Sequence, residues 1–327
     1  MNVDSGPADT PHGPGAGGAA AGDAVQPANQ RGGLIEAAAA DLGRALGQPL
    51  APGLYIVATP IGNLGDITLR ALSVLARADV IYCEDTRHSR TLAAHFRLTA
   101  PLRPYHEHNG AAERPRILAA LADGRRVALI SDAGTPLVSD PGFKLVREAV
   151  EAGHRVESLP GASAVLTALT VAGLATDTFL FAGFLPPKSA ARRTRLGELA
   201  GVAATLVFYE APQRLADTLA DLASVLGDRH AAVARELTKL HEEVRRGRLG
   251  ELALHFAAHE PRGEIAIVVG PALAVEATDA QIVEALATAL RDARLKDASK
   301  AVADALGVSR GRVYDIGLAL KRGADEA

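Results

Sequence analysis

The segment SDAGTPLVSDPG (131–142) gathers carboxylates, prolines and glycines within twelve residues. It holds the carboxylates Asp132 and Asp140, two glycines and two prolines, no basic side chain, and it directly follows the apolar run RVALI (126–130). Proline presets backbone dihedrals, and glycine lets a ligand approach the main chain closely. The pattern predicts a stiff acidic loop after a buried strand, with Asp140, followed by Pro141, as the cap of the next helix.

Three other loops follow predicted strands in the same way: TPIGNLGDIT (59–68), CEDTRHS (83–89) and PGASAV (160–165). In an open parallel sheet, ligands bind outside the carboxyl ends of the strands, near a switch in strand order. Ser163 and Ala164 would stand at a helix start, where free N–H groups could meet a carboxylate. Any one of these loops could be an ordinary turn, but four at one sheet edge favour a small molecule that is bound largely by backbone groups.

Several other kinds of site are excluded. No GxxxxGK[ST] motif is present, so a P-loop would lack its lysine, and TPIGNLG lacks the GxGxxG spacing of a dinucleotide site. The histidines of HEH (106–108) have no third ligand at a recognisable spacing, so we predict no catalytic metal. The single Cys83 excludes a disulfide framework and a cysteine-cluster zinc site, and it fits a reducing cytoplasm.

The elements that must position these loops alternate along the chain. Short apolar runs and longer helical patterns follow one another from Leu54 to Gly173, which predicts a parallel sheet with helices on both faces. A second group of five strands occupies 177–272. Because consecutive strands around 230–250 have no helix between them, this sheet should be mixed.

We therefore expect two α/β domains, at 51–176 and 177–272, and a small helical module at 273–327. Residues 1–50 are expected to be a disordered tail, since residues 1–33 are mostly Gly, Ala, Pro and Asp with little to bury. Within this tail, IEAAAADLGRAL (35–46) could form a short helix.

Composition limits the possible partners of this 327-residue chain. Apolar residues make up 48% and aromatic residues 4%, without tryptophan, so the core should be aliphatic. The net charge is −3, and residues 1–50, with five acids and two arginines, also sum to −3. The remaining 277 residues are neutral overall, so any affinity for nucleic acid must come from local patches. No run of roughly 18 residues is free of both charged and polar side chains, as a membrane span would be, so we predict a soluble, cytoplasmic protein.

The strongest basic patch is LPPKSAARRTR (185–195), which has no acidic residue. It is either a solvated loop or a contact for RNA phosphates, and the RNA contacts would be Lys188, Arg192, Arg193 and Arg195. VRRGR (244–248) is a weaker second candidate.

The C-terminal module carries a possible helix-turn-helix in KAVADALGVSRGRVYDIG (300–317). Ala303, Gly307 and Val313 have the spacing at which a small residue packs two helices and a glycine makes the turn. A plain helical hairpin is the alternative. We interpret the module as one that docks RNA or supports a dimer.

Seven motifs, taken in order, resemble the tetrapyrrole-methylase superfamily of S-adenosylmethionine enzymes. They are TPIGNLGDIT, EDTRHS, SDAGTPLVSDPG, PGASAV, FLPPK, FYEAPQR and RELTKLHEE, and the resemblance covers about 54–271. TPIGN stands where other members carry a GxGPG-like loop. This difference points to the branch that methylates the ribose 2′-hydroxyl of small-subunit ribosomal RNA.

The resemblance implies a homodimer, in which each chain holds S-adenosylmethionine in a cleft between its two α/β domains. Carried over motif by motif, it implies cofactor contacts at Pro60, Gly62, Asp132, Gly134, Thr135, Pro136, Ser163, Ala164, Tyr209, Glu210, Ala211, Leu237, Gly263 and Glu264. The implied substrate is a cytidine in the decoding region of 16S ribosomal RNA, free or within the 30S particle.

Methyl transfer from a sulfonium depends mainly on positioning, and a base or a cation should help to remove the hydroxyl proton. Candidates for this role are Glu84, Asp85, Arg87 and Lys239, then His106, Glu107, His108 and Glu242. Each charged candidate could instead be solvated or salt-bridged. Two other functions stay open: methylation of a corrin or porphyrinoid macrocycle, and non-catalytic regulation through nucleic-acid binding at 298–321.

Overall fold

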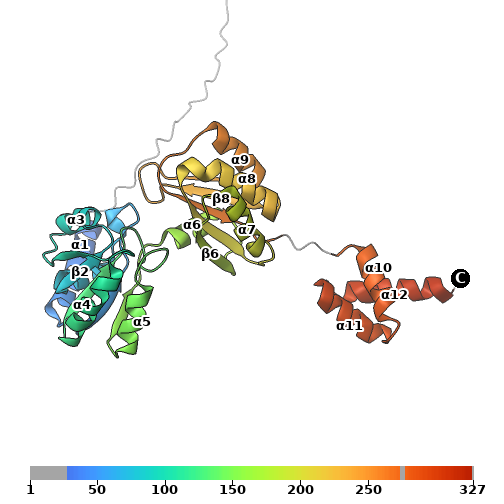
Figure 1. The fold of residues 1–327 in the computed structure, drawn as a ribbon, viewed down its shortest axis with the longest axis horizontal. Helices are drawn as coiled ribbons and strands as arrows, with labels where there is room; N and C mark the ends of the chain where they lie inside the picture. The colour runs from blue at the N-terminus through green and yellow to red at the C-terminus, as the bar shows by residue number, and fades with distance from the viewer. Residues whose placement is uncertain (1–27, 273–276, 326–327) are drawn as a thin grey trace, which may run out of the picture. The chain divides into compact units, whose positions relative to one another are not determined.

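The computed structural model describes residues 28–272 and 277–325 (Figure 1). These residues form two compact units. The first unit runs to Val57 and continues through 67–130 and 141–159. The second takes 58–66, 131–140 and the chain from Pro160 onward.

The first unit contains a five-stranded sheet in which all neighbouring strands are parallel, as predicted. The strand order is β3-β2-β4-β1-β5, and the strands are β1 Gly53–Val57, β2 Val80–Cys83, β3 Leu102–Pro104, β4 Arg126–Ile130 and β5 Val156–Leu159. All five residues of β1 are buried. Because strands buried on both faces read as continuous apolar runs, GLYIV and RVALI suit the centre of this sheet.

The helices of this unit are α1 Ala28–Gly47, α2 Leu69–Arg77, α3 Thr86–His95, α4 Gly110–Ala122 and α5 Phe143–Glu151. The chain leaves β1 towards β2 through α2 and leaves β4 towards β5 through α5, so these connections run in opposite directions along the sheet. With right-handed crossovers, α2 and α5 cover opposite faces. Neighbouring strands β1 and β4 therefore form the switch in strand order after which ligand-binding loops are expected. Segments 58–66 and 131–140 follow these two strands.

Helix α1 corrects the expectation of a disordered tail over 1–50. It covers the predicted short helix at 35–46 and begins earlier, at Ala28. The four consecutive alanines at 37–40 have the highest helix propensity, and α1 packs against α2. Residues 1–27 lie outside the described part of the chain.

The second unit contains the predicted mixed sheet, with strand order β6-β7-β10-β8-β9. Its strands are β6 Phe179–Phe184, β7 Thr205–Glu210, β8 His230–Arg235, β9 Glu243–Arg248 and β10 Ile265–Val269. Strands β6 and β7 are parallel, whereas the other neighbouring pairs are antiparallel. The helices are α6 Ala164–Ala172, α7 Ser189–Leu199, α8 Leu215–Leu226 and α9 Leu249–Ala258, with short 3-10 turns η1 Leu64–Asp66 and η2 Pro212–Arg214.

The two faces of this sheet pack against different helices. Alternate residues such as Phe208 and Ile267 join one core with α7, α8 and α9, whereas Val207 and Val268 face α6. Helix α6 contributes Val165, Ala168, Leu169 and Ala172 to this second core. The continuous part of the second unit therefore begins at Pro160 and not at the predicted residue 177, because the apolar face of α6 is buried against the second sheet.

The C-terminal module is helical, as predicted, with α10 Asp279–Ala289, α11 Leu295–Leu306 and α12 Arg310–Asp325. Ala303 and Val313 are buried in its core, and Gly307 ends α11 in the left-handed conformation at φ 65°. These positions match the predicted helix-turn-helix. Residues 273–276 and 326–327 are outside the described ranges. Among residues 28–272 and 277–325, no helix has the length and apolar character needed to cross a membrane.

Candidate active site

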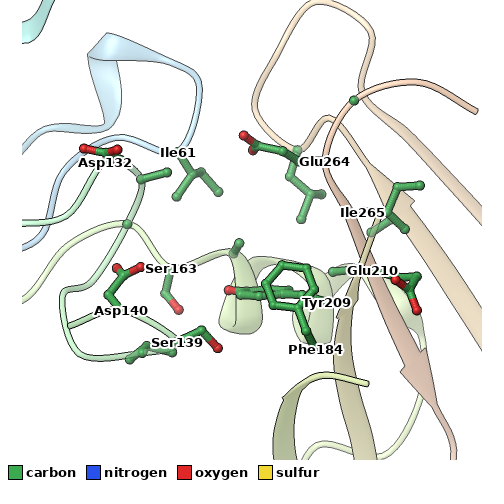
Figure 2. A pocket seen from close by; sticks show the side chains of 18 of the residues that line it. Ile61, Asp132, Ser139, Asp140, Ser163, Phe184, Tyr209, Glu210, Glu264 and Ile265 are labelled. Carbon is green, nitrogen blue, oxygen red and sulfur yellow. The ribbon is translucent and has the colours of Figure 1, made fainter. Parts of the chain in front are cut away.

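A pocket of about 410 Å³ lies within the second unit (Figure 2). Its wall combines Ile61 from the segment after β1, most of loop 131–140, the start of α6, and residues at the ends of β6, β7 and β10. This volume is in the range of pockets that hold drug-sized ligands and cofactors.

Backbone and hydroxyl hydrogen bonds fix the segments that form one wall. The N–H of Thr59 donates to the carbonyl of Gly134 at 2.9 Å, and the N–H of Gly134 donates back at 3.1 Å. The hydroxyl of Thr59 donates to the carbonyl of Ser131 at 3.0 Å, and that of Thr135 donates to the carbonyl of Ala162 at 3.1 Å. Three segments that are distant in sequence are thus joined at the pocket.

Loop 131–140 has an unusual backbone. Gly134 has φ 88°, and a Cβ there would lie 3.1 Å from Cγ2 of Ile61, so the position favours glycine. Leu137 and Ser139 also have positive φ, at 73° and 65°, which is costly for residues with side chains. Such a conformation persists only when surrounding contacts enforce it, as the joined segments do here.

Asp140 lines the pocket instead of capping a helix, so the predicted cap is wrong. Helix α5 begins at Phe143 with Gly142 as its N-cap. Burial raises the pKa of Asp140, a hydrogen bond with Ser131 opposes the shift, and the charge of Asp132 adds to it. Asp132 also lines the pocket, and Figure 2 shows both carboxylates on the side that the loop forms.

Tyr209 and Phe184 form the aromatic part of the pocket. The ring of Tyr209 meets those of Phe181 and Phe184 edge to face, with centroids 4.9 and 5.6 Å apart. Burial, followed by the nearby charge of Asp140, raises the pKa of Tyr209 to about 12. The phenol is therefore neutral at physiological pH.

Glu210 lines the pocket, but its carboxylate forms its contacts with other groups of the protein. The side chain is 0% exposed and forms an ion pair with Arg214, whose Nε donates at 2.8 Å. The hydroxyl of Thr218 and the N–H of Ala211 donate to it at 2.7 and 2.8 Å. A carboxylate with these partners has a structural role, even though residue Glu210 also lines the pocket.

Lys239 stands beside the pocket in a tight turn. Its Nζ lies 2.8 Å from Oε1 of Glu236 and 3.2 Å from Oε2 of Glu264, which lines the pocket. Partial burial lowers the pKa of Lys239, but the hydrogen bond to Glu236 and the charge of Glu264 outweigh this effect and leave the pKa above its ordinary value. Lys239 is therefore a cation and not a general base.

Two glycines let this turn approach its neighbours. A Cβ on Gly62 would lie 2.4 Å from Cγ of Lys239. Gly263 has φ 89°, and a Cβ there would lie 2.3 Å from Oε1 of Glu236. That Glu236 oxygen also accepts the N–H of Glu264 at 3.0 Å, so the turns at 236–239 and 263–264 are fixed to each other.

The other predicted catalytic residues belong to the first unit. Asp85 caps α3 and pairs with Arg87 at 2.7 Å, and these contacts with Arg87 hold the pKa of Asp85 at about 2, which makes it a weak base. Glu84 is exposed. None of the four predicted catalytic residues is among the described residues that line the pocket. In the described ranges no three His, Cys, Asp or Glu side chains gather as a metal site would require.

Most of the cofactor contacts implied by the motifs gather in this one pocket. Those that line it are Asp132, Gly134, Thr135, Ser163, Ala164, Tyr209, Glu210, Ala211, Leu237, Gly263 and Glu264. Pro60, Gly62 and Pro136 are not part of the described lining, although Ile61 and Thr135 beside them are. Ile61 and Ala133 lie within the predicted segments 60–62 and 132–136. Sequence reasoning missed Asp140 and Phe184, and also Val138, Ser139, Pro212, Ala234, Ile265 and Ala266.

The predicted RNA-contacting segment is mostly helix α7, and one of its four basic residues is buried within the protein. Arg192 is 3% exposed and pairs with Asp221 at 2.7 Å, so its prediction as a phosphate contact is wrong. The guanidinium of Arg193 donates to Ser224 at 3.0 Å, and that of Arg195 to Glu198 at 2.6 Å. Lys188 is exposed just before the helix.

Basic side chains of the weaker candidate segment, 244–248, also form hydrogen bonds within the protein. Arg246 donates to the carbonyls of Val171 and Ala172 at the end of α6. Arg248 donates to the carbonyl of Asp228 at 2.7 Å. A cation at a helix C-terminus satisfies carbonyls that have no partner within the helix, which is a structural use of the charge.

The chemistry of the lining suits a ligand that is partly cationic and partly apolar. Among the described residues, no lysine, arginine or histidine lines the pocket, whereas Asp132, Asp140 and Glu264 do. Tyr209 and Leu237 add apolar surface, and Ser163 stands at the start of α6. An adenosyl sulfonium with an amino-acid tail has these features, so the residues present fit S-adenosylmethionine.

Two family models match the chain. Residues 53–253 match the model described as Tetrapyrrole (Corrin/Porphyrin) Methylases, and residues 276–321 match the RsmI C-terminal HTH domain. Curated relatives named Ribosomal RNA small subunit methyltransferase I include one from Mesorhizobium japonicum, 53% identical over 81% of this chain and 90% of the relative. Another, from Pseudomonas aeruginosa, is 46% identical over 80% of this chain and 95% of the relative.

Solved structures share the fold. A uroporphyrin-III-C-methyltransferase from Thermus thermophilus aligns with a TM-score of 0.50 and 25% identity over 67% of this chain and 94% of its own. A diphthine synthase aligns with a TM-score of 0.52 over 66% of this chain and 89% of its own, and its 14% identity supports a shared fold alone.

Proposed function

The chain belongs to the tetrapyrrole (corrin/porphyrin) methylase family, and we propose that it methylates the ribose 2′-hydroxyl of a cytidine in the decoding region of small-subunit ribosomal RNA. The chain is thus a methyltransferase, and its methyl donor is S-adenosylmethionine. The observation that carries the choice of RNA is the 53% identity, over 81% of the chain, to a relative named for small-subunit ribosomal RNA. The matched C-terminal helix-turn-helix domain supports it.

Loop 131–140 and the ends of β7 and β10 would hold the cofactor. Asp132 and Asp140 would attract its positively charged part, while Tyr209 and Leu237 would contact the adenosine. When bound, the cofactor supplies a methyl group that its sulfonium has already made electrophilic. The remaining task of the protein is to hold the ribose hydroxyl in line and to manage its proton.

Lys239 is the residue we propose for the developing charge on the ribose oxygen. Its raised pKa keeps it protonated, and its contact with Glu264 keeps it at the edge of the pocket. A preorganised cation at such an edge can stabilise an oxyanion more effectively than water does. Glu84, Asp85 and Arg87 stay secondary candidates in this proposal.

The partner would be small-subunit ribosomal RNA or the 30S particle in the cytoplasm, bound by a homodimer. Lys188, Arg193 and Arg195 would contact phosphates, because each is exposed or half-exposed, Lys188 just before α7 and the two arginines within it. The helix-turn-helix module would add affinity for RNA or support the dimer.

Methyl transfer from radiolabelled S-adenosylmethionine tests the proposal. The protein would be incubated with 30S particles that lack the modification or with a precorrin-type macrocycle, and RNA alone should gain label as a 2′-O-methylated cytidine. Label on the macrocycle alone would overturn the RNA substrate. Label on a base instead of a ribose would overturn the 2′-hydroxyl.

A further inference from the structure

Phe184 is a large aromatic residue left 60% exposed where β6 ends at the pocket. Its ring packs edge to face on Tyr209, and the two lie together in Figure 2. A single exposed apolar side chain needs no explanation. The way in which the backbone presents this one is more informative.

A β-bulge turns Phe184 towards the pocket. Phe181 pairs with Val207 and Phe184 with Tyr209, so β6 uses one residue more than β7 over this interval. Within the bulge, Gly183 has φ 66°, and a Cβ there would lie 3.3 Å from Oγ of Ser139. Bulges of this kind occur beside active sites, where they redirect a side chain.

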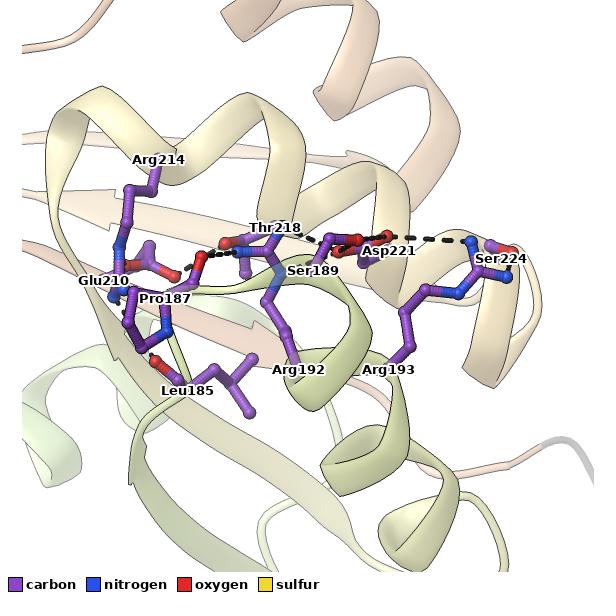
Figure 3. Close-up of polar contacts among 10 residues, drawn as sticks. All are labelled: Leu185, Pro187, Ser189, Arg192, Arg193, Glu210, Arg214, Thr218, Asp221 and Ser224. Carbon is purple, nitrogen blue, oxygen red and sulfur yellow. Dashed lines mark hydrogen bonds and ion pairs between the residues drawn. The ribbon is translucent and has the colours of Figure 1, made fainter.

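Two buried ion pairs hold the backbone that follows Phe184 (Figure 3). Arg214, paired with Glu210, donates to the carbonyl of Leu185 at 3.5 Å. Arg192, paired with Asp221, donates to the carbonyl of Pro187 at 3.3 Å. The backbone next to Phe184 is therefore held in place. A ligand that stacks on the ring would lose little binding free energy to ordering of the chain.

We propose that Phe184 is the stacking platform for the nucleobase of the nucleotide that is methylated. This inference rests on the proposed function, since it names how that RNA substrate is held. A nucleobase that is drawn out of its helical stack loses stacking energy, and an exposed aromatic face can replace the lost contact. Exposed Lys188, four residues further along the chain, supplies the positive charge that the attached phosphates need.

The test compares full-length Phe184→Ala with Phe184→Tyr and with Phe179→Ala. Phe179 is the matched control because it is a half-exposed phenylalanine at the other end of β6, away from the described pocket lining. The substrate is 30S particles reconstituted from transcribed, unmethylated ribosomal RNA. The readouts are KM for the particles, kcat, and the dissociation constant for S-adenosylmethionine from calorimetry.

Phe184→Ala should raise KM for the particles about 5- to 150-fold, the range for removing one base-stacking contact. The dissociation constant for S-adenosylmethionine should stay within about twofold of the wild-type value, and Phe184→Tyr should restore KM. Phe179→Ala should behave as the wild type.

Four outcomes would overturn the inference. An unchanged KM in Phe184→Ala, with wild-type transfer to RNA intact, removes the stacking role and leaves the proposed function standing. An equal loss of S-adenosylmethionine affinity assigns the ring to the cofactor, and an equal effect of Phe179→Ala assigns the loss to strand β6. Wild-type protein that transfers no methyl group to RNA removes the proposed function, and the inference with it.

Discussion

Glu210 and Asp140 both line the pocket, yet their surroundings differ completely. Glu210 is fully buried and accepts hydrogen bonds from Arg214, Thr218 and the backbone of Ala211. Asp140 has a hydroxyl partner in Ser131, a like charge in Asp132 and a raised pKa. One carboxylate is neutralised by Arg214, whereas none of the described residues that line the pocket offers the other a cation.

The same contrast between matched and ligand-facing carboxylates distinguishes the two faces of the second sheet. Towards α7 and α8, charged groups are matched within the chain, as Glu210 is by Arg214 and Asp221 by Arg192 (Figure 3). On the α6 face, at the pocket, carboxylates are gathered without a basic residue in the described lining. Charges that are matched within the chain stabilise the fold, whereas a buried carboxylate with a raised pKa, such as Asp140, is a candidate for binding a cationic ligand.

The largest expected effect is on stability, in Glu210→Ala. Removing this carboxylate leaves the guanidinium of Arg214 and the hydroxyl of Thr218 without their partner, and breaking a buried pair costs about 3 kcal/mol or more. Urea unfolding should show this loss in the free energy of unfolding. Glu264→Ala is the control, because its side chain is 73% exposed and the change should be small. Equal stability of the two variants would contradict the structural role of Glu210.

Lys239→Met should reduce catalysis next most strongly. If Lys239 stabilises the ribose oxyanion, kcat with 30S particles should fall about 100-fold, while the affinity for S-adenosylmethionine changes little. Lys239→Arg keeps the positive charge and should retain most of the activity. A Lys239→Met enzyme with wild-type kcat would exclude the oxyanion role.

Asp140→Asn should weaken binding of S-adenosylmethionine about 10-fold or more, since it removes a charged partner. S-adenosylhomocysteine lacks the sulfonium charge and should lose much less. Calorimetry with both ligands measures the difference. The same loss for both would show that Asp140 does not respond to the charge of the ligand.

The same carboxylate sets a pH dependence. Burial raises the pKa of Asp140, and a bound cation favours the ionised form. The affinity for S-adenosylmethionine should therefore fall as the pH drops through this raised pKa, above the range in which an exposed aspartate titrates. Asp140→Asn should flatten this dependence, and a wild-type slope in the variant would assign the proton to another group.

Lys188→Ala should give the smallest effect. A single phosphate contact changes RNA affinity modestly and should lower the salt slope of binding by about one. Arg192→Ala provides the contrast, because it should lower stability without changing the salt slope of the folded protein. A slope that is unchanged in Lys188→Ala would remove it from the RNA interface.

Much of this site could be predicted because the loops that follow the strands can be recognised in the sequence from their glycines and prolines. SDAGTPLVSDPG and PGASAV both line the pocket, as their positions after strands indicated. The alternating elements likewise predicted a parallel and a mixed sheet, and both are present.

The roles of individual charges could not be predicted, since they depend on partners that are distant in sequence. Arg192 resembles its neighbour Arg193 along the chain, but only Arg192 is buried, against an aspartate 29 residues away. Asp140 precedes a proline as a helix cap often does, yet α5 has Gly142 as its N-cap and Asp140 lines the pocket. Helix α6 follows the first sheet in sequence and packs on the second, because its apolar face matches that core.

The most direct test of the account is a crystal structure of the protein with S-adenosylhomocysteine, which carries the adenosine and the amino-acid tail of the donor. The account predicts the ligand in the pocket between loop 131–140 and Tyr209, with its sulfur nearer to Asp140 than to the carboxylate of Glu210. A ligand bound elsewhere, or one that displaces Arg214 to reach Glu210, would contradict it.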